Sequence, residues 1–582
     1  MSSETHYYIG IDVGTGSARA LLVKKDGTAI TSSTQDITTW RDPHDHRIFE
    51  QSTTDIWSAI GRAVKTCLAE SGVKPGDVKG VGFDATCSLA VTDFEGEPVV
   101  ISKAEGLGEK GERNIILWAD HRAEKEAELI NGTGSVVLDY FGGKMSLEMD
   151  FPKILWLKNT MSPAHFSRCQ FFDLPDYLTY RATRDSTRSR CSVTCKCSFI
   201  PESGWQANFF EKIGLGQLVT EEYRQMGGEN GNVLAAGLPV GKGLSKRAAE
   251  ELCLVEGTPV GSGLIDAYAG WLGTVAARYK ENGKLSDVVP SLKESQHRLA
   301  AVAGTSTCHL VQSPEGVFVN GVWGPYKDAV FRGWWMNEGG QSSTGQLIDF
   351  ILTTHPAYPK LVEQGKEEQK NIHTVLQELL EKLRVESGVE SLTELTKDLH
   401  IYPDFHGNRS PIADPRMRGS IVGLELDSGL TDLAKRYNVT LEAIALQTRH
   451  IVDEMNIKGH SITSIYMSGG QAKNIALMQL FANACSMPVV LPFEHSGAVV
   501  LGAAMLGRFA AEASAKGAKG IDSEQQGEAL WNIMVEMTPP GTVVPPKATE
   551  KEKRLLEAKY KIFREQIEIQ TRWRKEMEEA AK

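Results

Sequence analysis

The beginning of the chain alternates short apolar runs with glycine-containing turns. Residues 7–12 and 18–24 are rich in side chains that favour strands, and the loop at 13–17 between them contains two glycines. Asp26-Gly27 marks a second turn before a further short run at 29–31. The pattern predicts a strand, a glycine loop and a second strand at the start of the fold.

The same theme recurs further along the chain. The spacing of apolar positions predicts a helix at 55–69, and a short strand follows at 80–83. The apolar run 299–303 then leads into a polar glycine loop at 304–307 and a second apolar run at 308–311. The first half therefore mixes strands with helices, and a strand, loop and strand unit reappears in the second half.

A third glycine loop lies late in the chain. The apolar run 465–467 ends in Ser468-Gly469-Gly470, and a helix is predicted to begin near Lys473. Glycine loops thus occur at strand ends in both halves. They predict two α/β lobes with a nucleotide held between them, and a boundary between the lobes somewhere in 267–299.

Three further segments are interpreted as structural. The charged segment 359–397 has helical spacing and predicts a solvent-facing helical insertion without catalytic residues. The apolar segment 497–510 is too short to cross a bilayer and predicts a closely packed core helix. After the prolines within 539–546, residues 548–582 predict a long amphipathic helix. We expect that helix to pack on the protein's own surface; binding to a partner or dimerisation is the alternative.

Length and charge narrow the class of protein. At 582 residues the chain is longer than one hydrophobic core usually sustains, which agrees with two large lobes. Its formal net charge of −11 argues against a general nucleic-acid-binding protein, because binding to phosphates needs clustered Lys and Arg. Residues 1–8 lack the basic and apolar regions of a secretion signal, and the nine cysteines are scattered. We expect a cytoplasmic protein with reduced thiols and no nucleic-acid or membrane partner.

The first glycine loop carries candidate phosphate-binding groups. Gly14 and Gly16 allow backbone N–H groups to converge on an anion. Thr15 and Ser17 add hydroxyl donors, and Asp12 is suited to hold Mg²⁺ against phosphates. The loop therefore fits a nucleoside triphosphate.

Other phosphate motifs are excluded by inspection. Arg19 stands where a dinucleotide-binding loop needs its third glycine, and Gly241-Lys242-Gly243 lacks the Ser or Thr that follows the lysine of a P-loop. Taken alone, the loop at 13–17 would as readily be an ordinary hairpin. Its pairing with the loop at 304–307 favours phosphate binding.

The three loops together resemble the nucleotide-binding segments of the actin-like ATPase superfamily. Residues 12–19 and 304–307 resemble its two phosphate segments, and Ser468-Gly469-Gly470-Gln471 resembles its adenosine segment. Within that superfamily the chain resembles the FGGY carbohydrate kinases over about residues 8–507. The segments that carry this resemblance are Trp118-Ala119-Asp120-His121-Arg122-Ala123, Pro152-Lys153-Ile154-Leu155-Trp156-Leu157, Gly263-Leu264-Ile265-Asp266-Ala267 and Gly407-Asn408-Arg409-Ser410-Pro411.

The resemblance implies an α/β fold with two actin-like (ribonuclease H-like) lobes and a nucleotide and sugar cleft between them. We expect an N-terminal lobe at 1–270 with the sugar site and the first phosphate loop. A C-terminal ATP-binding lobe is expected at 271–540, followed by a charged helical extension at 541–582. The implied small molecules are a sugar, ATP and Mg²⁺, and a homodimer is left open.

The resemblance also implies that Asp266 is the catalytic base. A sugar hydroxyl is a poor nucleophile at neutral pH, so a carboxylate within hydrogen-bond reach helps by accepting its proton. The alternative role is a helix cap, because helical residues are predicted from Ala267 onwards.

The remaining site residues are implied in the same way. The substrate-binding residues are Thr86, Cys87, Ser88, Trp118, Asp120, Arg122, Lys196, Asp266 and Glu338. The nucleotide-binding residues are Asp12, Gly14, Thr15, Gly16, Ser17, Arg19, Gly304, Thr305, Ser306, Gln341, Gly469, Gly470, Gln471 and Asn474, and the Mg²⁺ ligands are Asp12 and Asp266. The competing interpretations are a buried strand end for 86–88, a surface loop around Trp118, and solvent-facing charges for Lys196 and Glu338.

The first expected substrate is D-ribulose, implied by the Thr86-Cys87-Ser88 segment. L-ribulose, D-xylulose, ribitol and glycerol remain alternatives, because hydroxyl geometry decides between them. An actin- or chaperone-like ATPase would share the phosphate loops without needing the sugar residues, and a regulator would bind sugar without turning it over. Lys435-Arg436-Tyr437 departs from the family pattern, which puts the helix geometry after Asp432 in doubt.

Overall fold

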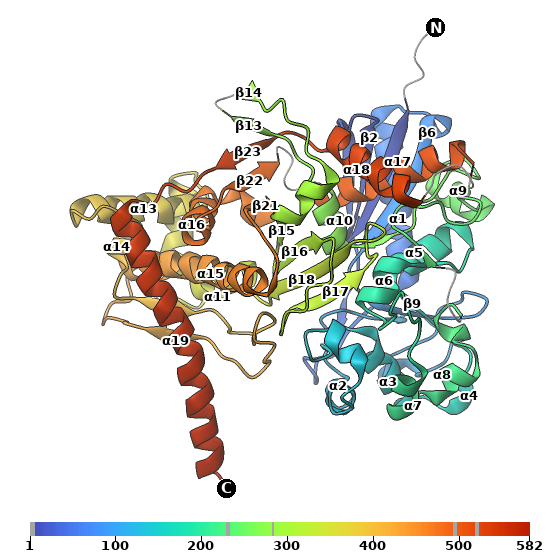
Figure 1. Ribbon diagram of the computed structural model, residues 1–582, viewed down its shortest axis with the longest axis horizontal. Coiled ribbons are helices and arrows are strands. Elements are labelled where there is room, and N and C mark those ends of the chain that lie inside the picture. The colour runs from blue at the N-terminus through green and yellow to red at the C-terminus, as the bar shows by residue number, and fades with distance from the viewer. Residues whose placement is uncertain (1–5, 229–232, 282–283, 493–496, 518–522) are drawn as a thin grey trace.

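The structure is a computed structural model, and it describes residues 6–228, 233–281, 284–492, 497–517 and 523–582. The first residues of the segment 1–8 therefore lie outside the described residues. Figure 1 shows helices and strands mixed along the whole chain, with the long C-terminal helix reaching away from the body. The predicted α/β class is confirmed.

The first of two related sheets is built on the predicted hairpin. Its spatial order is β12 (Leu264–Ile265), β6 (Val78–Ala85), β1 (Tyr7–Val13), β2 (Ser17–Lys24) and β3 (Ala29–Asp36). β1 is antiparallel to β2 and parallel to β6. Helix α1 (Thr53–Ser71) is capped by Ser52, whose side chain accepts a hydrogen bond from Asp55 N. The buried side chains of this helix include Ile56, Ile60 and Val64. The expected strands and helix are all present.

The second sheet repeats this order inside a larger one. Its spatial order is β14 (Lys284–Leu285), β13 (Tyr279–Glu281), β23 (Gly541–Val544), β22 (Val489–Pro492), β21 (Ser464–Ser468), β15 (Arg298–Ala303), β16 (Thr307–Ser313), β18 (Trp335–Gln341) and β17 (Trp323–Lys327). β15 is antiparallel to β16 and parallel to β21, as β1 is to β2 and β6. The two glycine loops therefore occupy equivalent turns of two similar sheets.

Helix α17 (Ala498–Ala515) joins the two halves. It comes from the second half of the chain but packs on β1 and β6, where glycines allow close approach. A Cβ atom on Gly82 would lie 1.9 Å from the carbonyl oxygen of Ala503, and one on Gly10 would lie 2.0 Å from that of Val500. Among the described residues α17 is the one helix long and apolar enough to cross a membrane, so the expectation that this segment is too short was wrong, because the helix continues to Ala515. Most of its side chains are nevertheless buried inside the protein, as predicted for a core helix. The division of the chain at residue 270 stays a prediction.

Two predictions about helices are refined by the structure. The charged insertion contains α12 (Tyr358–Glu367) and α13 (Ile372–Glu386), and α13 buries Val375, Leu376 and Leu380. It is therefore amphipathic and not wholly solvent-facing. Lys435-Arg436-Tyr437 lies within the continuous helix α15 (Leu430–Lys458), so the departure from the family pattern does not interrupt that helix.

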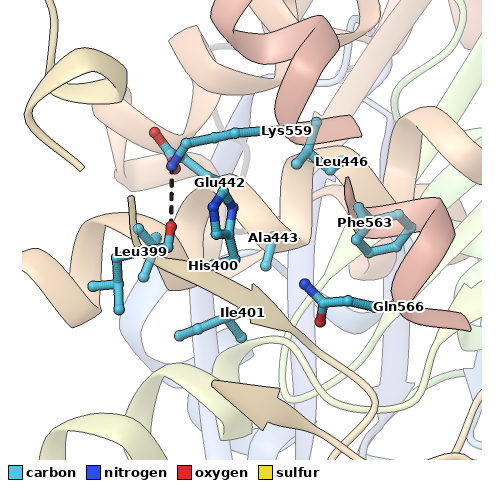
Figure 2. A pocket seen from close by; sticks show the side chains of 10 residues that line it. Leu399, His400, Ile401, Glu442, Ala443, Leu446, Lys559, Phe563 and Gln566 are labelled. Atoms are coloured by element: carbon cyan, nitrogen blue, oxygen red, sulfur yellow. Dashed lines mark hydrogen bonds and ion pairs between the residues drawn. The ribbon is translucent and has the colours of Figure 1, made fainter. Parts of the chain in front are cut away.

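The C-terminal helix α19 (Glu550–Ala580) docks on α15. The side chain of Thr549 caps the start of the helix. One face of the helix is buried, and it carries Leu556, Tyr560 and Phe563 at helical spacing. Lys559 is 5% exposed; its Nζ donates to Glu442 Oε2 on α15 at 2.5 Å and to the Thr396 carbonyl at 2.8 Å. Figure 2 shows Lys559 and Glu442 side by side at the edge of a small cavity under α19. The predicted packing on the protein's own surface is thus present.

Replacing Lys559 with methionine should loosen this docking. The change leaves the Glu442 carboxylate buried without its cation, which typically lowers the free energy of unfolding by about 3–5 kcal/mol. Denaturant or thermal unfolding measures the loss. The matched control is Lys553→Met, because Lys553 pairs with Glu550 at the exposed start of the same helix. Equal unfolding midpoints for the two variants would contradict a docking role for Lys559.

Candidate active site

Three carboxylates gather where the first sheet ends. Asp12 near the end of β1 lies opposite Asp84 near the end of β6 in the parallel register. Leu264 of β12 also lies opposite Asp84, and Asp266 follows directly as the first residue of α10 (Asp266–Leu272). Asp84 is fully buried, whereas Asp12 and Asp266 are partly exposed. The strand register therefore brings one acid from each of three elements to one place.

Burial and the neighbouring acids disfavour the ionised forms of Asp84 and Asp266. Burial, and then the charge of Asp12, raises the pKa of Asp266 to about 7. Burial, and then the charges of Asp12 and Asp266, raises the pKa of Asp84 well above its usual range. Asp84 lies within hydrogen-bond reach of Asp12, and its oxygens accept no hydrogen bond from an N–H or hydroxyl group within the described parts of the chain. Buried oxygens of this kind suit a cation such as Mg²⁺, which prefers carboxylate ligands.

Asp266 does not act mainly as a helix cap. The N-cap position of α10 belongs to Ile265, and among the described residues the hydrogen bond of Asp266 Oδ1 is with the N–H of the next residue, Ala267, at 2.7 Å. Its carboxylate is partly exposed, and the charge of Asp12 acts on its pKa, so the two acids lie close together.

A backbone hydrogen bond from the first glycine closes each of the two predicted phosphate loops. Gly14 N donates to Ser17 O at 3.0 Å in the first, and Gly304 N donates to Ser306 O at 2.8 Å in the second. Thr15, Gly16, Gly304 and Thr305 are exposed. Each loop thus holds a tight turn that presents its tip to solvent.

Arg19 stands beside the first loop. Its Nε donates to Thr34 Oγ1 at 3.3 Å, and its positive charge lowers the pKa of Asp12, although burial, the larger influence, raises it overall. The predicted position of Arg19 near the phosphate groups is compatible with this proximity to Asp12.

The third glycine loop touches the second. Gln471 Nε2 donates to Gly304 O at 2.7 Å and to Thr344 Oγ1 at 2.6 Å. Gly469 has a φ of 87°, and a Cβ there would lie 2.2 Å from the Ala303 carbonyl oxygen, so the loop depends on glycine. Gly470 continues the loop into the following turn. The predicted adenosine segment therefore adjoins the predicted phosphate segment.

Two predicted nucleotide residues hold the framework in place. Gln341 is fully buried, and its Nε2 donates to the Ile444 carbonyl of α15 at 2.8 Å. Asn474 caps α16 (Ile475–Cys485) and donates to Tyr437 Oη at 2.9 Å. Thr344, which the sequence interpretation missed, links Gln471 to the second phosphate loop, because its hydroxyl also bonds that of Thr307 at 2.8 Å.

Trp118 connects the predicted sugar residues to the first phosphate loop. Its Nε1 donates to Thr15 Oγ1 at 3.0 Å, and its backbone N–H donates to Ser88 Oγ at 3.1 Å. The hydroxyls of Ser88 and Thr86 are 3.1 Å apart, and Cys87 between them is buried. The segment 86–88 thus lies next to the nucleotide side of the site.

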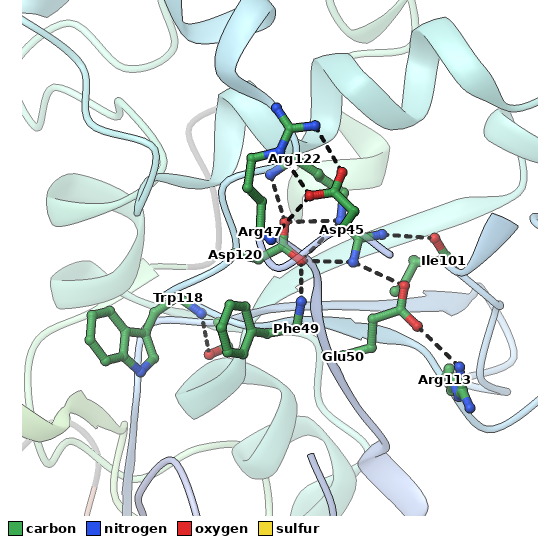
Figure 3. Close-up of polar contacts among 10 residues, drawn as sticks. Asp45, Arg47, Phe49, Glu50, Ile101, Arg113, Trp118, Asp120 and Arg122 are labelled. Atoms are coloured by element: carbon green, nitrogen blue, oxygen red, sulfur yellow. Dashed lines mark hydrogen bonds and ion pairs between the residues drawn. The ribbon is translucent and has the colours of Figure 1, made fainter. Parts of the chain in front are cut away.

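Asp120 and Arg122 form an ion pair with each other. Figure 3 shows their side chains inside a network of ion pairs and hydrogen bonds. Arg122 Nη2 lies 2.7 Å from Asp120 Oδ2 and 2.9 Å from Glu50 Oε1, and Phe49 N donates to Asp120 Oδ2 at 2.7 Å. Both side chains are buried and have protein partners for their charges. These contacts hold the segment that carries Trp118, and the sugar-binding role of both residues stays a prediction.

Lys196 and Glu338 meet between the two halves. Lys196, at the C-terminal end of α6 (Arg190–Cys195), places its Nζ 3.6 Å from Glu338 Oε2 on β18. Both are almost fully buried. The charges of Lys196 and Glu338 also act on the pKa of Asp266, after the effects of burial and of Asp12, so the pair lies near the carboxylates. Neither is the solvent-facing charge of the competing interpretation.

The sequence interpretation missed two members of this group. Arg409 Nη2 donates to Glu338 Oε1 at 2.5 Å, and its guanidinium lies 4.1 Å from the ring centre of Trp323. Lys196 Nζ lies 4.6 Å from the same ring centre. Arg409 belongs to the quoted segment 407–411, which was the one signal of its importance, whereas Trp323 had none. Asp84 directly follows the predicted strand 80–83 and was not singled out.

Comparisons with known proteins agree with this geometry. The N-terminal domain of the FGGY family of carbohydrate kinases matches residues 7–273, and the C-terminal domain matches 299–511. D-ribulokinase from Saccharomyces cerevisiae is 44% identical over 531 residues, which cover 88% of this chain and 72% of the relative. An FGGY carbohydrate kinase domain-containing protein from Homo sapiens is 40% identical over 569 residues, with 97% and 96% coverage.

A solved structure shares the fold. The xylulose kinase from Rhodospirillum rubrum superposes with a TM-score of 0.72 at 18% identity, covering 98% of this chain and 99% of that one. Sugar kinases of this kind have two actin-like lobes, in agreement with the two similar sheets described above. With two domain profiles matched across most of its length, the chain belongs to the FGGY family of carbohydrate kinases and is a sugar kinase.

Proposed function

We propose that the protein transfers the γ-phosphoryl group of ATP to D-ribulose, giving ADP and D-ribulose 5-phosphate, with Asp266 as general base. The observation that carries this proposal is the carboxylate of Asp266, whose pKa is raised to about 7 next to the first phosphate loop and the Lys196–Glu338 pair. The choice of sugar is supported by the Thr86-Cys87-Ser88 segment and by the D-ribulokinase from yeast.

Asp266 handles the proton of the reaction. Its ionised carboxylate accepts the proton of the hydroxyl on C5 as that oxygen forms a bond to the γ-phosphorus and the bond to the β-phosphate oxygen breaks. A base with a pKa near neutrality is well matched to this task, because it is about half ionised at pH 7 and mostly ionised at pH 8, yet still basic enough to take the proton.

The glycine loops bind and orient the nucleotide. Exposed backbone N–H groups and hydroxyls of the two loops are suited to the phosphate oxygens. Gln471 fixes the third loop against the second, so the adenosine and phosphate subsites are held together. Trp118 ties Thr15 to the sugar side and thereby sets the distance between the two substrates.

The carboxylates fit a Mg²⁺ ion. Asp12 would hold it together with Asp84, which lies opposite Asp12 in the sheet and offers carboxylate oxygens of the kind that Mg²⁺ prefers. Asp266, the second ligand that the sequence predicts, would serve as the base instead, because a carboxylate bound to Mg²⁺ accepts a proton poorly. When bound, the ion supplies positive charge that neutralises the phosphate oxygens of ATP.

A panel of sugars tests the substrate. Sugar-stimulated ADP release should be highest with D-ribulose and lower with L-ribulose, D-xylulose, ribitol and glycerol, because hydroxyl geometry sets the discrimination. A different sugar as the best substrate would contradict the D-ribulose assignment. ATP hydrolysis that no sugar stimulates would contradict kinase action on all of them.

The variant Asp266→Asn tests the base. It should keep its fold and lower kcat by about 10²–10⁴, because an amide cannot accept the proton. Steady-state kinetics at saturating ATP and sugar give kcat, and circular dichroism checks the fold. Asp427→Asn, in an exposed loop, is the matched control. A folded Asp266→Asn variant that retains more than about a tenth of the turnover would rule out this role.

The pH profile tests the same residue independently. Because only the ionised carboxylate is active and the pKa of Asp266 is raised to about 7, kcat/KM should rise with pH through neutrality and level off above it. The measurement is kcat/KM for the sugar from about pH 5.5 to 8.5 at saturating Mg²⁺ and ATP. A rate that is independent of pH over this interval, or that falls as pH rises through 7, would disagree with the assignment.

A further inference from the structure

We propose that Glu148 and Arg409, which come from opposite halves of the chain, are sugar-binding residues that share the hydroxyl on C1, at the end of the sugar remote from the reacting C5 hydroxyl. This inference rests on the proposed function and deepens it. Neither residue belongs to the set that the family resemblance implies, and both are identified by the contacts around Glu338.

The distance between the two side chains suits a bridging hydroxyl. Arg409 Nη2 lies 3.9 Å from Glu148 Oε2, which is too long for a direct hydrogen bond. One hydroxyl oxygen can lie about 2.8 Å from both atoms, since the two atoms are closer together than twice that length. Such a hydroxyl accepts from the guanidinium and donates to the carboxylate, so both charges are used at once.

Arg409 is buried but not fully satisfied. Its side chain is 7% exposed, and its Nε has no hydrogen-bond partner among the described residues. Its hydrogen bonds go to Glu338 Oε1 at 2.5 Å and Cys308 Sγ at 3.5 Å, both on the second sheet, and its guanidinium lies over the Trp323 ring. Oε2 of Glu338 is likewise buried and lacks a hydrogen bond within the described chain. Buried polar atoms without partners cost free energy, which a polyol would recover by binding them.

Glu148 lies where several elements converge. It precedes α3 (Asp150–Thr160), and its side chain is 16% exposed. Apart from burial, which is the largest influence on each group, the charge of Glu148 acts to raise the pKa of side chains from both halves. These are Cys87, His121, Lys153, Lys196, Cys308 and Arg409. A carboxylate that close to so many groups, yet without a direct hydrogen bond to Arg409, is placed for a ligand between them.

The order of charged groups fits an extended five-carbon sugar. Asp266 lies near Lys196 and Glu338, and Arg409 binds the far oxygen of Glu338. Glu148 Oε2 lies 3.9 Å from Arg409 Nη2. These contacts link the base, through the buried pair, to Arg409 and Glu148, whose donors and acceptors suit the hydroxyls of a sugar.

The side chain of Arg409 packs directly against Gly340 of β18. A Cβ on Gly340 would lie 2.7 Å from both Cδ and Nε of Arg409, so this glycine of β18 makes room for the side chain. The substitution Gly340→Ala therefore displaces the guanidinium without removing its charge.

The experiment compares KM values for sugar and ATP in Glu148→Gln, Arg409→Lys and Gly340→Ala. Each should raise KM for the sugar by about 10- to 100-fold and leave KM for ATP within about twofold, because the lost interactions are with the sugar alone. Quenching of tryptophan fluorescence by sugar, without ATP, should show the same loss of affinity. The matched controls are Glu128→Gln on the exposed face of α2 (Glu124–Asn131) and Arg416→Met in the loop after Arg409, and both should behave as wild type.

A deoxy sugar separates binding from a merely structural effect. With wild type, 1-deoxy-D-ribulose should lose about 10²-fold or more in kcat/KM relative to D-ribulose, because the polar groups of the C1 subsite are left unpaired. In Glu148→Gln the same comparison should show a loss at least tenfold smaller. An equal loss in both proteins, or an equal rise of both KM values in the variants, would overturn the proposal.

The outcomes also separate this inference from the proposed function. If wild type prefers another sugar, the D-ribulose assignment fails, and the variants are judged on that sugar and its deoxy analogue. If wild type phosphorylates D-ribulose while Glu148→Gln and Arg409→Lys retain wild-type KM values, only the C1 subsite is refuted. If wild type neither binds nor phosphorylates any sugar of the panel, both proposals are overturned.

Discussion

The structure depends on three acids that the sheet forces together. The parallel register of β1 and β6 sets Asp12 opposite Asp84, and the short strand β12 delivers Asp266 to the same end. Burial raises the pKa of all three acids, and the charges of neighbouring acids add to the rise for Asp84 and Asp266. Such an arrangement costs stability unless a proton or a cation compensates it. Under the proposed function, the metal–nucleotide complex and the proton of the sugar hydroxyl would provide both.

The proposed sugar site is built from residues of both halves of the chain. Lys196 comes from the first half, whereas Glu338, Arg409 and Trp323 come from the second. Backbone contacts hold the halves in register nearby, since Gly321 N donates to Gly142 O at 3.0 Å. The buried ion pairs therefore serve geometry more than stability, because two desolvated charges gain little net free energy from pairing.

Local patterns in the sequence predicted much of the fold and part of the site. The hairpin loops at 13–17 and 304–307, the core helix α17 and the amphipathic helix α19 all follow from glycine turns and apolar spacing. The repeat of strand order between the two sheets did not follow, because it is a pairing between distant segments. Arg409 and Asp84 were missed for the same reason: their partners lie on other elements.

In the Asp120–Arg122 pair, by contrast, the two partners are close together in the sequence. The residues are two positions apart, and the family resemblance implies sugar contacts for both, which stay a prediction. The structure gives their charges protein partners, including Glu50 from a distant strand segment. Long-range burial decides whether such a pair faces a ligand or the protein interior.

The most direct test of this account is a crystal structure of the protein with D-ribulose and a non-hydrolysable ATP analogue. The account predicts the C5 hydroxyl within about 2.6–3.2 Å of an Asp266 carboxylate oxygen and in line with the γ-phosphorus. It also predicts the phosphates against the loops at 13–17 and 304–307. An Asp266 carboxylate turned away from the sugar, with another group in contact with the C5 hydroxyl, would contradict it.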